Sequence, residues 1–508
     1  MLGKTYYLET FGCQMNVLDS ELVEGQLRAL GYCPADSARR ADLVLYNTCS
    51  VRQHAEDKVL SRLGSMGHVK RRRPDVIVGV IGCMAEREKE ALFDKSPHVD
   101  LLCGPNELHR LPGLIEQVAA RRGRLAALAG TGSRKRQAFE RAFEADSLEA
   151  LDLSRQVSPG EHSLQAYVRV QRGCDQFCTF CVVPFTRGPE RSRSPGHIVE
   201  EVRRLASQGC REVTLLGQTV NSYVHQEDGR PVRFAALLER VHAVEGIDRI
   251  RFVTSFPADW DEDIFRVMRD YPKVCPYLHI PAQSGSDRML KAMNRGYTVD
   301  SYKRLMDTAR RYVPDIALAS DFIVGFCGEI EADFQATVDL VRWVQYKNIF
   351  VFKYSPRPGT AADRLKDDDV PAEVKQHRNN ELLAVQAEIA ARRNQGLVGR
   401  RFAVLVEGHS KAAIRARNGE ELPVESKIHA RDRSRQLVGR TPQDQIAVFD
   451  GDPSLVGAIV DARVESASAL TLFCDDVRVI SPPRSAKLAA GPALDGKSFS
   501  LPLLPAMQ

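Results

Sequence analysis

Three cysteines lie close together in the run Gly173-Cys174-Asp175-Gln176-Phe177-Cys178-Thr179-Phe180-Cys181. The spacing C-x-x-x-C-x-x-C holds three thiolates in one short loop and brings no fourth cysteine beside them. An iron–sulfur cluster normally takes four cysteine ligands. A four-iron cluster on these three would therefore leave one iron free for an exchangeable molecule. The two phenylalanines between the thiols suit a loop that shields such a cluster.

Zinc is the alternative metal for the same triplet. A structural zinc site needs four ligands, usually in two pairs, and the next cysteine, Cys210, follows a predicted helix with no second cysteine beside it. The spacing therefore favours an iron–sulfur cluster. It resembles the signature of the radical S-adenosylmethionine (SAM) superfamily. That resemblance implies that the free iron chelates SAM and that one electron from the cluster cleaves SAM to a 5′-deoxyadenosyl radical.

The bulk composition is that of an ordinary globular protein. The chain has 508 residues, of which 43% are hydrophobic and 27% charged, and a net charge of +5. This length suggests roughly two to four domains, and the charge leans slightly towards polyanions. No signal peptide and no apolar stretch of membrane-spanning length is apparent, so we expect a cytoplasmic protein without a membrane partner. Twelve cysteines in a reducing compartment indicate metal binding or catalysis rather than disulfides.

The first 120 residues alternate short apolar runs with amphipathic runs, the pattern of a parallel α/β domain. We predict strands at Tyr6–Leu8, Leu43–Tyr46 and Val76–Ile81, each followed by a helix, at about Leu18–Leu30, Gln53–Val69 and Ala85–Leu92.

A cysteine follows each of these strands: Cys13, Cys49 and Cys83. The carboxyl ends of parallel strands share one edge of a sheet, so the three thiols are expected to form a second site. Any one of them alone is better explained as a small buried apolar residue, but three in equivalent positions favour a cluster. Cys103 lies at a similar strand end, and we expect it to pack in the core rather than to be a fourth ligand.

The motifs resemble those of the radical SAM methylthiotransferase family, from the first strand to about residue 480. The resemblance is carried by Glu9–Asn16, Asn47–Arg52 and Gly173–Gly188. Within the family, Gln14-Met15-Asn16 and Val182-Val183-Pro184-Phe185-Thr186 resemble the MiaB-type branch, which methylthiolates C2 of N6-isopentenyladenosine at position 37 of tRNA, next to the anticodon. A RimO-like enzyme acting on a ribosomal-protein aspartate is the first alternative, and a non-catalytic iron–sulfur RNA-binding protein is the second.

The resemblance implies two 4Fe–4S clusters with SAM as a further cofactor. Cys174, Cys178 and Cys181 would bind the radical cluster. Cys13, Cys49 and Cys83 would bind the auxiliary cluster, whose open iron would hold the sulfur. Adenine C2–H is unactivated, so a carbon radical is needed to replace its hydrogen. The implied partners are the tRNA anticodon stem-loop, an external one-electron donor such as flavodoxin or ferredoxin, and a sulfur donor. We expect the protein to act as a monomer.

Residues 161–395 continue the strand–helix alternation with six predicted strands: Ala166–Val170, Glu212–Leu216, Arg249–Val253, Tyr277–Ile280, Ala317–Val324 and Asn348–Tyr354. Six such units predict a partial, open (βα)6 barrel, with the chemistry on its carboxyl rim. Rim segments that match the family pattern give five candidate SAM contacts: Gly217, Gln218, Gln283, Ser284 and Asp321. The chain has Cys327 where the family has proline, and we expect no cluster role for this cysteine.

The remaining segments are basic or irregular. Residues 121–160 read as a basic linker, residues 396–480 as a β-rich domain without helices, and residues 481–508 as a disordered tail. The β-rich part resembles the TRAM domain, a small antiparallel barrel that grips tRNA. Its candidate phosphate contacts are Lys411, Arg415, Arg417, Lys427, Arg431, Arg433 and Arg435. Near the radical cluster, Arg187, Arg191 and Arg193 are expected to help recognise the target base.

Overall fold

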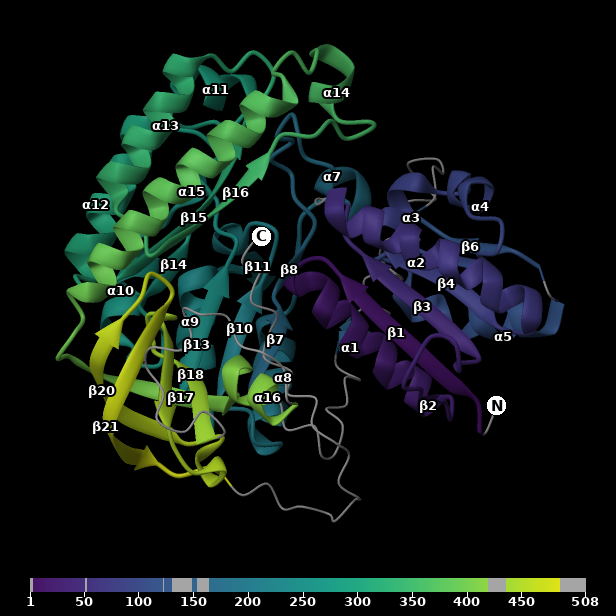
Figure 1. The fold of residues 1–508 in the computed structure, drawn as a ribbon, viewed down its shortest axis with the longest axis horizontal. Helices are drawn as coiled ribbons and strands as arrows, with labels where there is room; N and C mark the ends of the chain where they lie inside the picture. Colours follow the sequence, from purple (N-terminus) through teal and green to yellow (C-terminus); the bar gives the residue numbers. More distant parts are fainter. Residues whose placement is uncertain are drawn as a thin grey trace.

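The computed structural model describes residues 3–50, 53–121, 123–129, 149–152, 164–418 and 435–484. Figure 1 shows three parts: an N-terminal sheet with helices on both faces, a central array of strands wrapped by helices, and a C-terminal barrel next to the central part. Within the described ranges, no helix combines the length and the apolar character needed to cross a membrane.

The N-terminal part is a six-stranded sheet in the order β2-β1-β3-β4-β5-β6, with every pairing parallel. Its strands are β1 (Thr5–Phe11), β2 (Cys33–Pro34), β3 (Leu43–Thr48), β4 (Ile77–Gly82), β5 (Leu101–Cys103) and β6 (Leu125–Ala127). Its helices are α1 (Gln14–Ala29), α2 (Gln53–Arg72), α3 (Cys83–Glu88), α4 (Ala91–Lys95) and α5 (Leu111–Arg121). The predicted parallel α/β class is confirmed. The sheet continues past residue 120, because β6 pairs with β5.

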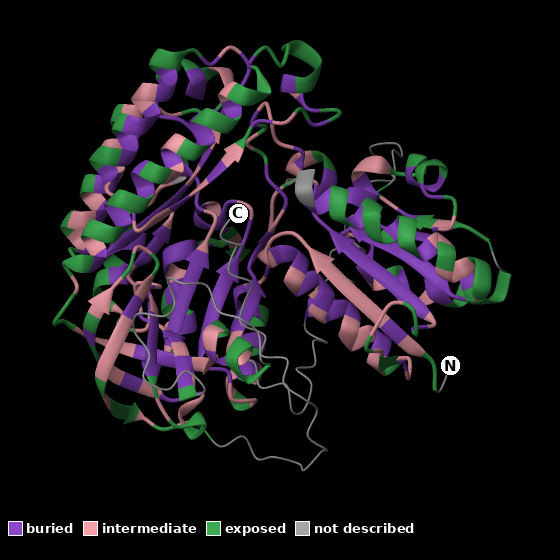
Figure 2. Cartoon of the chain, in the orientation of Figure 1, coloured by how far each residue is buried: buried purple, intermediate pink, exposed green. Residues whose placement is uncertain are grey.

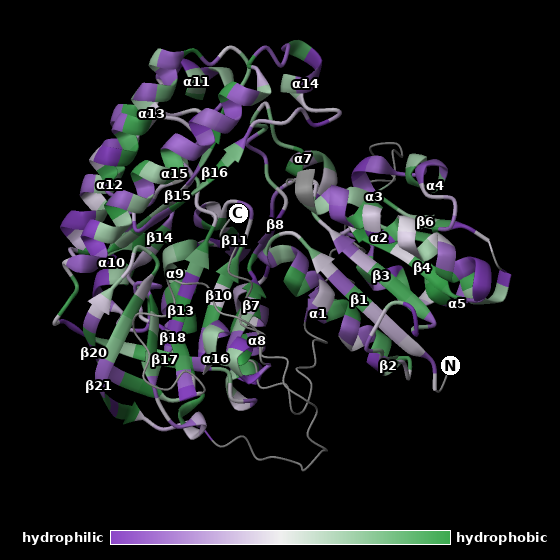
Figure 3. Cartoon of the chain, viewed as in Figure 1, coloured by the Kyte–Doolittle hydropathy of each residue, from purple (hydrophilic) through white to green (hydrophobic). Residues whose placement is uncertain are grey.

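Alternation along the central strands builds a core on each face of this sheet. In β3, Leu43 and Leu45 pack in one apolar cluster with α1 and α5, whereas Val44 and Tyr46 pack in another with α2 and α3. Figures 2 and 3 show these strands as buried and hydrophobic between more exposed helices. The single helix predicted over Ala85–Leu92 is wrong: Lys89 has a φ of 51° and separates α3 from α4.

The central part has the six predicted strands, with ends within about one residue of those expected. They form two parallel three-stranded sheets, one of β7 (Gln165–Arg169), β10 (Glu212–Leu216) and β13 (Arg249–Val253), the other of β14 (Tyr277–His279), β15 (Ala317–Val324) and β16 (Asn348–Lys353). A parallel bridge between Ile250 and Val274 brings the two sheets together. In the described residues, no strand pairing joins β7 to β16, so the barrel is open. Its apolar core extends through both sheets.

The helices of the central part are α7 (Val183–Thr186), α8 (Pro195–Ser207), α9 (Phe234–His242), α10 (Glu262–Asp270), α11 (Asp287–Ala292), α12 (Val299–Tyr312), α13 (Glu331–Val344), α14 (Ala361–Leu365) and α15 (Ala372–Gln395). Two antiparallel strand pairs are added to the rim: β8 (Gln171–Arg172) with β9 (Arg191–Ser192), which flank the cysteine loop and α7, and the hairpin of β11 (Val224–Glu227) with β12 (Arg230–Arg233).

The C-terminal part is a closed five-stranded barrel, β17-β18-β19-β21-β20. Its strands are β17 (Arg401–His409), β18 (Gln436–Arg440), β19 (Ile446–Asp450), β20 (Ile459–Ala467) and β21 (Thr471–Ser481). Four pairings are antiparallel, and β19 pairs with β21 in parallel. The expectation that helices stop after residue 396 is wrong, because α16 (Lys411–Arg417) begins at a Ser410 cap that accepts from the Ala413 amide. Most of the predicted linker and the tail from residue 485 lie outside the described residues.

Buried charges fasten this barrel to the amino-terminal ends of the central strands. Arg249 donates to the carbonyls of Ala403 and Arg440, and Arg251 to those of Thr441 and Pro442. Lys347, next to the start of β16, lies 2.7 Å from Asp444. The barrel therefore closes the end of the central part opposite the predicted rim.

Asp444 is the anion at this junction. Its carboxylate also accepts from Arg440 at 2.6 Å. Burial by itself would raise the pKa of Asp444, but Lys347 and Arg440 outweigh burial and hold it well below its ordinary value.

Asp444→Asn is expected to destabilise the junction, because it leaves the buried Lys347 without its carboxylate partner and Arg440 with Glu407, at 3.4 Å, as its remaining one. Removing one partner of a buried pair costs about 3–5 kcal/mol. Urea unfolding and limited proteolysis would measure the loss. The matched control is Asp476→Asn on the same barrel, whose partner Arg401 shares a more exposed pair and for which a change below about 1 kcal/mol is expected. Equal losses in the two variants would contradict this account of the junction.

Candidate active site

The three N-terminal cysteines lie at one edge of the first sheet. Cys13 caps α1 after β1, Cys49 directly follows β3, and Cys83 opens α3 after β4. The three strands are neighbours in register, with Phe11 opposite Thr48 and Thr48 opposite Gly82. A Cβ added at Gly12 would lie 2.5 Å from the Cβ of Cys49. The structure therefore brings the Cys13 and Cys49 turns into contact, with the Cys83 turn beside them.

Buried amides brace these turns. Asn16 donates to the Asn47 side-chain oxygen at 2.9 Å, and Asn47 donates to the Asn16 carbonyl at 2.8 Å. Gly82, with a φ of 91°, approaches so closely that a Cβ there would lie 2.4 Å from the same Asn47 oxygen. Only glycine fits at this position, since both the φ and the close contact exclude a side chain. The brace fixes the backbone from which the thiols project.

The thiols of this group differ in acidity. A hydrogen bond from Cys49, with help from the charge of Arg187, lowers the pKa of Cys13 to about 6 despite its burial. Burial raises the pKa of Cys83. All three are free thiols. A thiolate that is already favoured and is held beside other thiols is a suitable starting point for binding iron, since the thiolate is the metal-binding form.

The second cysteine group lies in the loop that follows β7 and β8. The loop is clamped at several points: the Cys174 amide donates to Gly188 O at 3.2 Å, and the Thr179 amide donates to Met293 O at 3.0 Å. A Cβ at Gly173 would lie 2.0 Å from Pro189 O, so this entry to the loop requires glycine. Burial raises the pKa of Cys174 to about 11 and that of Cys181 to about 12, and the neighbouring thiols add to both shifts.

Arg295 contacts this group and was not found by sequence reasoning. Its Nη1 donates to the sulfur of Cys178 at 3.1 Å, and its guanidinium lies 4.6 Å from the centre of the Phe256 ring. The side chain is buried. No carboxylate within the described part of the chain forms an ion pair with it, so its nearest anionic partner would be the Cys178 thiolate. A lone arginine between Asn294 and Gly296 carries no signal in the sequence.

The candidate SAM contacts lie along the carboxyl rim. Gln283 has a φ of 67°, and its side-chain oxygen is buried without a hydrogen-bond partner in the described structure. The Gln218 side-chain oxygen is likewise buried without a hydrogen-bond partner in the described structure. Left-handed backbone is uncommon for residues other than glycine and often marks a functional site. Two unpartnered carboxamide oxygens fit the presence of a polar ligand here.

The other three candidates are held by protein contacts. Gly217 packs so closely that a Cβ would lie 2.8 Å from the Gln171 side-chain oxygen. The Ser284 hydroxyl is within 3.3 Å of the Thr337 hydroxyl on α13. Asp321 on β15 lies 3.0 Å from Nε2 of His279 on β14. The last pair places the imidazole at the end of β14 beside a carboxylate in the middle of the neighbouring β15.

A buried ion network joins the two cysteine groups. Asp19, on α1, accepts from Arg169 on β7 and from Arg187 just after α7, each at 2.8 Å. Asp152 pairs with Arg169 and Arg172. Arg187 also raises the acidity of Cys13 and lies near Cys83, and α7 packs on α3. One buried network therefore ties the loop with Cys181 to the turns with Cys13 and Cys83.

This network corrects the expectation for two arginines. Arg187 and Arg193 were expected to recognise a base, but both are buried. Arg193 pairs with Glu149 and Glu201, each at 2.8 Å. Their guanidinium groups are engaged by carboxylates and have a structural role.

Cys103 and Cys327 lie in apolar surroundings. Cys103 is fully buried in the N-terminal core, where its thiol faces the Gly104 carbonyl at 3.7 Å. Cys327 packs beside Phe326 and Tyr354.

Each of the two cysteine groups offers three free thiols. Within the described ranges, no three His, Cys, Asp or Glu side chains surround a point where one metal ion would sit. A four-iron cluster instead binds each thiolate at a separate iron corner. Two sets of three free thiols, one of them with a buried arginine on a sulfur, fit that arrangement.

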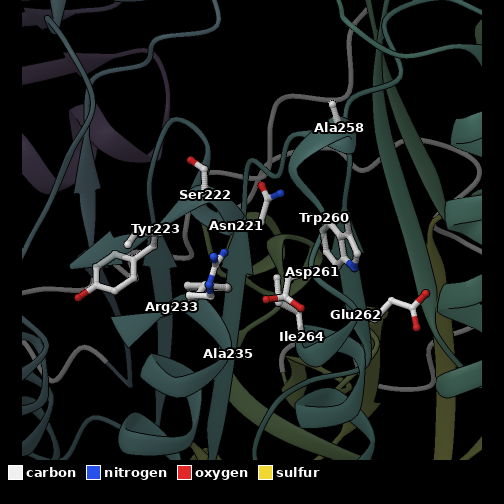
Figure 4. A pocket seen from close by; sticks show the side chains of 12 residues that line it. Asn221, Ser222, Tyr223, Arg233, Ala235, Ala258, Trp260, Asp261, Glu262 and Ile264 are labelled. Carbon is white, nitrogen blue, oxygen red and sulfur yellow. The ribbon is translucent and has the colours of Figure 1, made fainter. Parts of the chain in front are cut away.

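A separate pocket of about 510 Å³ lies beside the rim, between the loops that follow β10 and β13 (Figure 4). Asn221, Arg233, Trp260 and Glu262 are among its lining residues. None of the candidate cysteine or SAM-contact residues lines it, so it is not the site assembled above.

Family models match all three parts of the chain. Residues 5–104 match the model described as uncharacterized protein family UPF0004, residues 168–341 match the radical SAM superfamily, and residues 415–475 match the TRAM domain.

Curated relatives match nearly the whole chain. A protein of Rhodopirellula baltica named tRNA-2-methylthio-N(6)-dimethylallyladenosine synthase is 46% identical, over 93% of this chain and 95% of its own length. A protein of Syntrophotalea carbinolica with the same name is 42% identical, over 91% of this chain and 98% of its own length.

Among solved structures, the radical S-adenosylmethionine methyltransferase TsrM from Kitasatospora setae has a similar fold. Its structure with cobalamin and a [4Fe-4S] cluster superposes with a TM-score of 0.52 at 14% identity, over 72% of this chain and 77% of that one. At this identity the likeness concerns the fold alone.

Asp19→Asn is expected to separate the two cysteine groups, because Arg169 and Arg187 lose their shared anion in a buried place. A loss of about 3 kcal/mol or more in unfolding free energy is expected, together with faster proteolysis between the first two parts. Glu24→Gln on the same helix is the control, since its pair with Arg28 is half-exposed and contributes about 0.3–0.5 kcal/mol. Wild-type stability and protease resistance in Asp19→Asn would refute the role of the network.

Arg295→Met is expected to lower the midpoint potential of a cluster reconstituted on Cys174, Cys178 and Cys181. The positive charge and the N–H···S bond favour the more reduced, more negative state. A tenfold change in that preference corresponds to about 59 mV for one electron, and a shift of that order is expected in an EPR-monitored redox titration. Arg295→Lys, which keeps the charge, should recover part of the shift. An unchanged potential in Arg295→Met would show that the guanidinium does not act on the cluster.

Proposed function

The chain belongs to the family of tRNA-2-methylthio-N(6)-dimethylallyladenosine synthases, and from this premise we propose that it methylthiolates C2 of N6-isopentenyladenosine beside the tRNA anticodon. Relatives with that name match more than nine-tenths of the chain at 42–46% identity. This is the single observation that carries the proposal. The shared name favours the tRNA over the alternative of a ribosomal-protein aspartate.

Enzymes of this radical SAM family use [4Fe–4S] clusters and SAM. We assign Cys174, Cys178 and Cys181 to the radical cluster, and Cys13, Cys49 and Cys83 to the auxiliary cluster. When bound, the first supplies the electron that cleaves SAM, and the second presents the sulfur that is to be transferred. The hydrogen bond from the buried Arg295 to the sulfur of Cys178 and the close packing of the Cys13 and Cys49 turns support this division.

The remaining residues hold and orient the reactants. The side-chain oxygens of Gln218 and Gln283 would accept hydrogen bonds from SAM, since both are buried without a protein partner. Asp321 and His279 would bind a further polar group of SAM. The network around Asp19 holds both thiol groups in one body, which fixes the distance that the substrate must bridge. Holding two bound reactants in the geometry of the reaction contributes a large part of the rate acceleration in reactions of this kind.

The closed barrel would grip tRNA by its phosphates. Lys411, Arg415 and Arg417 lie on α16 and Arg435 precedes β18. Lys427, Arg431 and Arg433 lie outside the described residues. Phosphate contacts of this kind are independent of sequence and weaken with salt. Because buried arginines fix the barrel to the central part, the grip would hold the RNA at a set position relative to the rim.

We also propose that the protein works as a cytoplasmic monomer with an external one-electron donor, such as flavodoxin or ferredoxin, and a separate sulfur donor. Neither cysteine group by itself provides a source of electrons or replaces the sulfur that leaves in each turnover.

Anaerobic reconstitution with iron and sulfide tests the proposal. The wild type should cleave SAM with dithionite and convert an isopentenylated anticodon stem-loop to its 2-methylthio form, as read by mass spectrometry. Cys178→Ala should abolish both reactions. Cys83→Ala should abolish sulfur insertion while SAM cleavage continues. Cys33→Ala, an exposed cysteine on β2, is the matched control and should retain both reactions.

Four outcomes would contradict the proposal. SAM cleavage by Cys178→Ala, or full sulfur insertion by Cys83→Ala, would show that the cysteines have other roles. Absence of any modified nucleoside in the wild type, with methylthioaspartate formed on ribosomal protein instead, would favour the RimO-like alternative. Absence of SAM cleavage in fully loaded wild type would favour a binding protein without catalysis.

A further inference from the structure

Two exposed phenylalanines stand beside the candidate radical cluster. Phe177 lies within the cysteine loop, directly before Cys178, and Phe185 lies on α7. Each is 56% exposed. Their rings pair edge to face, with centroids 6.4 Å apart and planes at 72°. Exposed phenyl rings normally fold inward, because each gains free energy on leaving water. A pair presented to solvent at this place therefore requires an explanation.

The backbone holds Phe177 in this exposed position. Its φ of 46° is in the left-handed region, which is uncommon for an aromatic residue. Asn294 donates from its side chain to the carbonyl of Phe177 at 3.1 Å, and the clamps at Cys174 and Thr179 fix both ends of the loop. These contacts fix the backbone from which the Phe177 ring projects beside Phe185.

The third phenylalanine of this region behaves differently. Phe180 is turned towards the protein. Its ring meets Phe326 edge to face at 6.4 Å and packs against a group of buried apolar side chains that includes Met289 and Met293. The loop thus buries one ring on the protein side and presents the other two. Core packing accounts for Phe180 and does not account for the exposed pair.

We propose that Phe177 and Phe185 form a stacking platform for the unpaired nucleobases that flank the target adenosine in the RNA loop. This inference rests on the function proposed above and names the surface that receives the substrate. A base that reacts at the cluster must leave its stack. Its neighbours then lose a stacking partner, and an aromatic side chain replaces that partner in many proteins that bind single-stranded RNA.

The chemistry of the pair fits this occupant. Phenyl rings offer faces for stacking and no hydrogen-bonding groups, so they would hold bases of any identity. The edge-to-face arrangement presents two differently directed faces, which suits bases splayed apart rather than a continuous helix. A protein partner, such as an electron donor, would instead be expected to bury a patch of up to about 600 Å² on each side even in a weak redox encounter, which is more than two rings provide.

Binding of RNA to the reconstituted protein tests the platform. The probe is a fluorescein-labelled isopentenylated anticodon stem-loop, with its affinity followed by anisotropy under anaerobic conditions. Phe177→Ala and Phe185→Ala should each weaken binding about 5- to 150-fold. Phe185→Trp should bind within about threefold of the wild type, whereas Phe185→Leu, which is apolar but has no π face, should lose nearly as much as Phe185→Ala.

Matched controls separate folding from binding. Iron content must equal that of the wild type; if Phe177→Ala loads poorly, Phe185→Ala, which lies outside the cysteine loop, decides the test. Trp343→Ala, an exposed aromatic residue on α13 that contacts Lys303, should bind RNA as the wild type does.

Wild-type RNA affinity in fully loaded Phe185→Ala and Phe177→Ala would overturn the inference while leaving the proposed function intact. Unchanged RNA affinity with loss of flavodoxin-driven turnover would assign the pair to the electron donor and also overturn it. Failure of the wild-type protein to bind or modify the stem-loop would refute the proposed function itself, and this inference with it.

Discussion

A buried ion network joins the N-terminal and central parts of the chain between the two cysteine groups. Asp19 comes from the first helix of the N-terminal sheet, whereas Arg169 and Arg187 come from the central part, on either side of the cysteine loop. Charges taken out of water are costly unless they are paired, so the carboxylate and both guanidinium groups must stay together. Relative motion of the two parts would separate them. The distance between the two thiol groups is therefore set by this network rather than by a linker.

The C-terminal barrel extends the same principle to the other end of the molecule. Arg249, Arg251 and Lys347 at the base of the central strands reach backbone carbonyls and a carboxylate of the barrel. The proposed chemistry lies on the carboxyl rim, so RNA held by the barrel at the opposite end would have to be a long substrate. A tRNA is long enough to contact both. Rigid attachment at both places would present the same loop of the RNA to the rim each time.

The sequence allowed the layered architecture to be predicted because strand alternation and cysteine spacing are local signals. The six central strands, the parallel first sheet and the β-rich end of the chain follow from such patterns, whereas the barrel was expected from the resemblance to the TRAM domain. The break at Lys89 and helix α16 were missed, because a single left-handed residue and a short helix in a β-rich segment leave little trace in a pattern of apolar residues.

The site was predictable only in part. The cysteines could be predicted as cluster ligands from their residue type and spacing. Arg295, Asp19 and Asn47 act through contacts between residues that are far apart in the chain, which no local pattern reveals. The expected role of Arg187 and Arg193 in base recognition was wrong for the same reason. From the sequence alone, a basic residue beside a cysteine loop is expected at the surface, and only the structure shows its carboxylate partners.

The central claim is that one chain carries two distinct clusters, each on three thiolates and each with an open iron. EPR of the reduced, reconstituted protein tests it most directly, combined with iron analysis. The account predicts about eight iron atoms per chain and two separable signals, of which only one changes when SAM is added and only the other disappears when Cys13, Cys49 and Cys83 are all replaced by alanine. A single signal with about four iron atoms, or two signals that both remain in the triple variant, would contradict it.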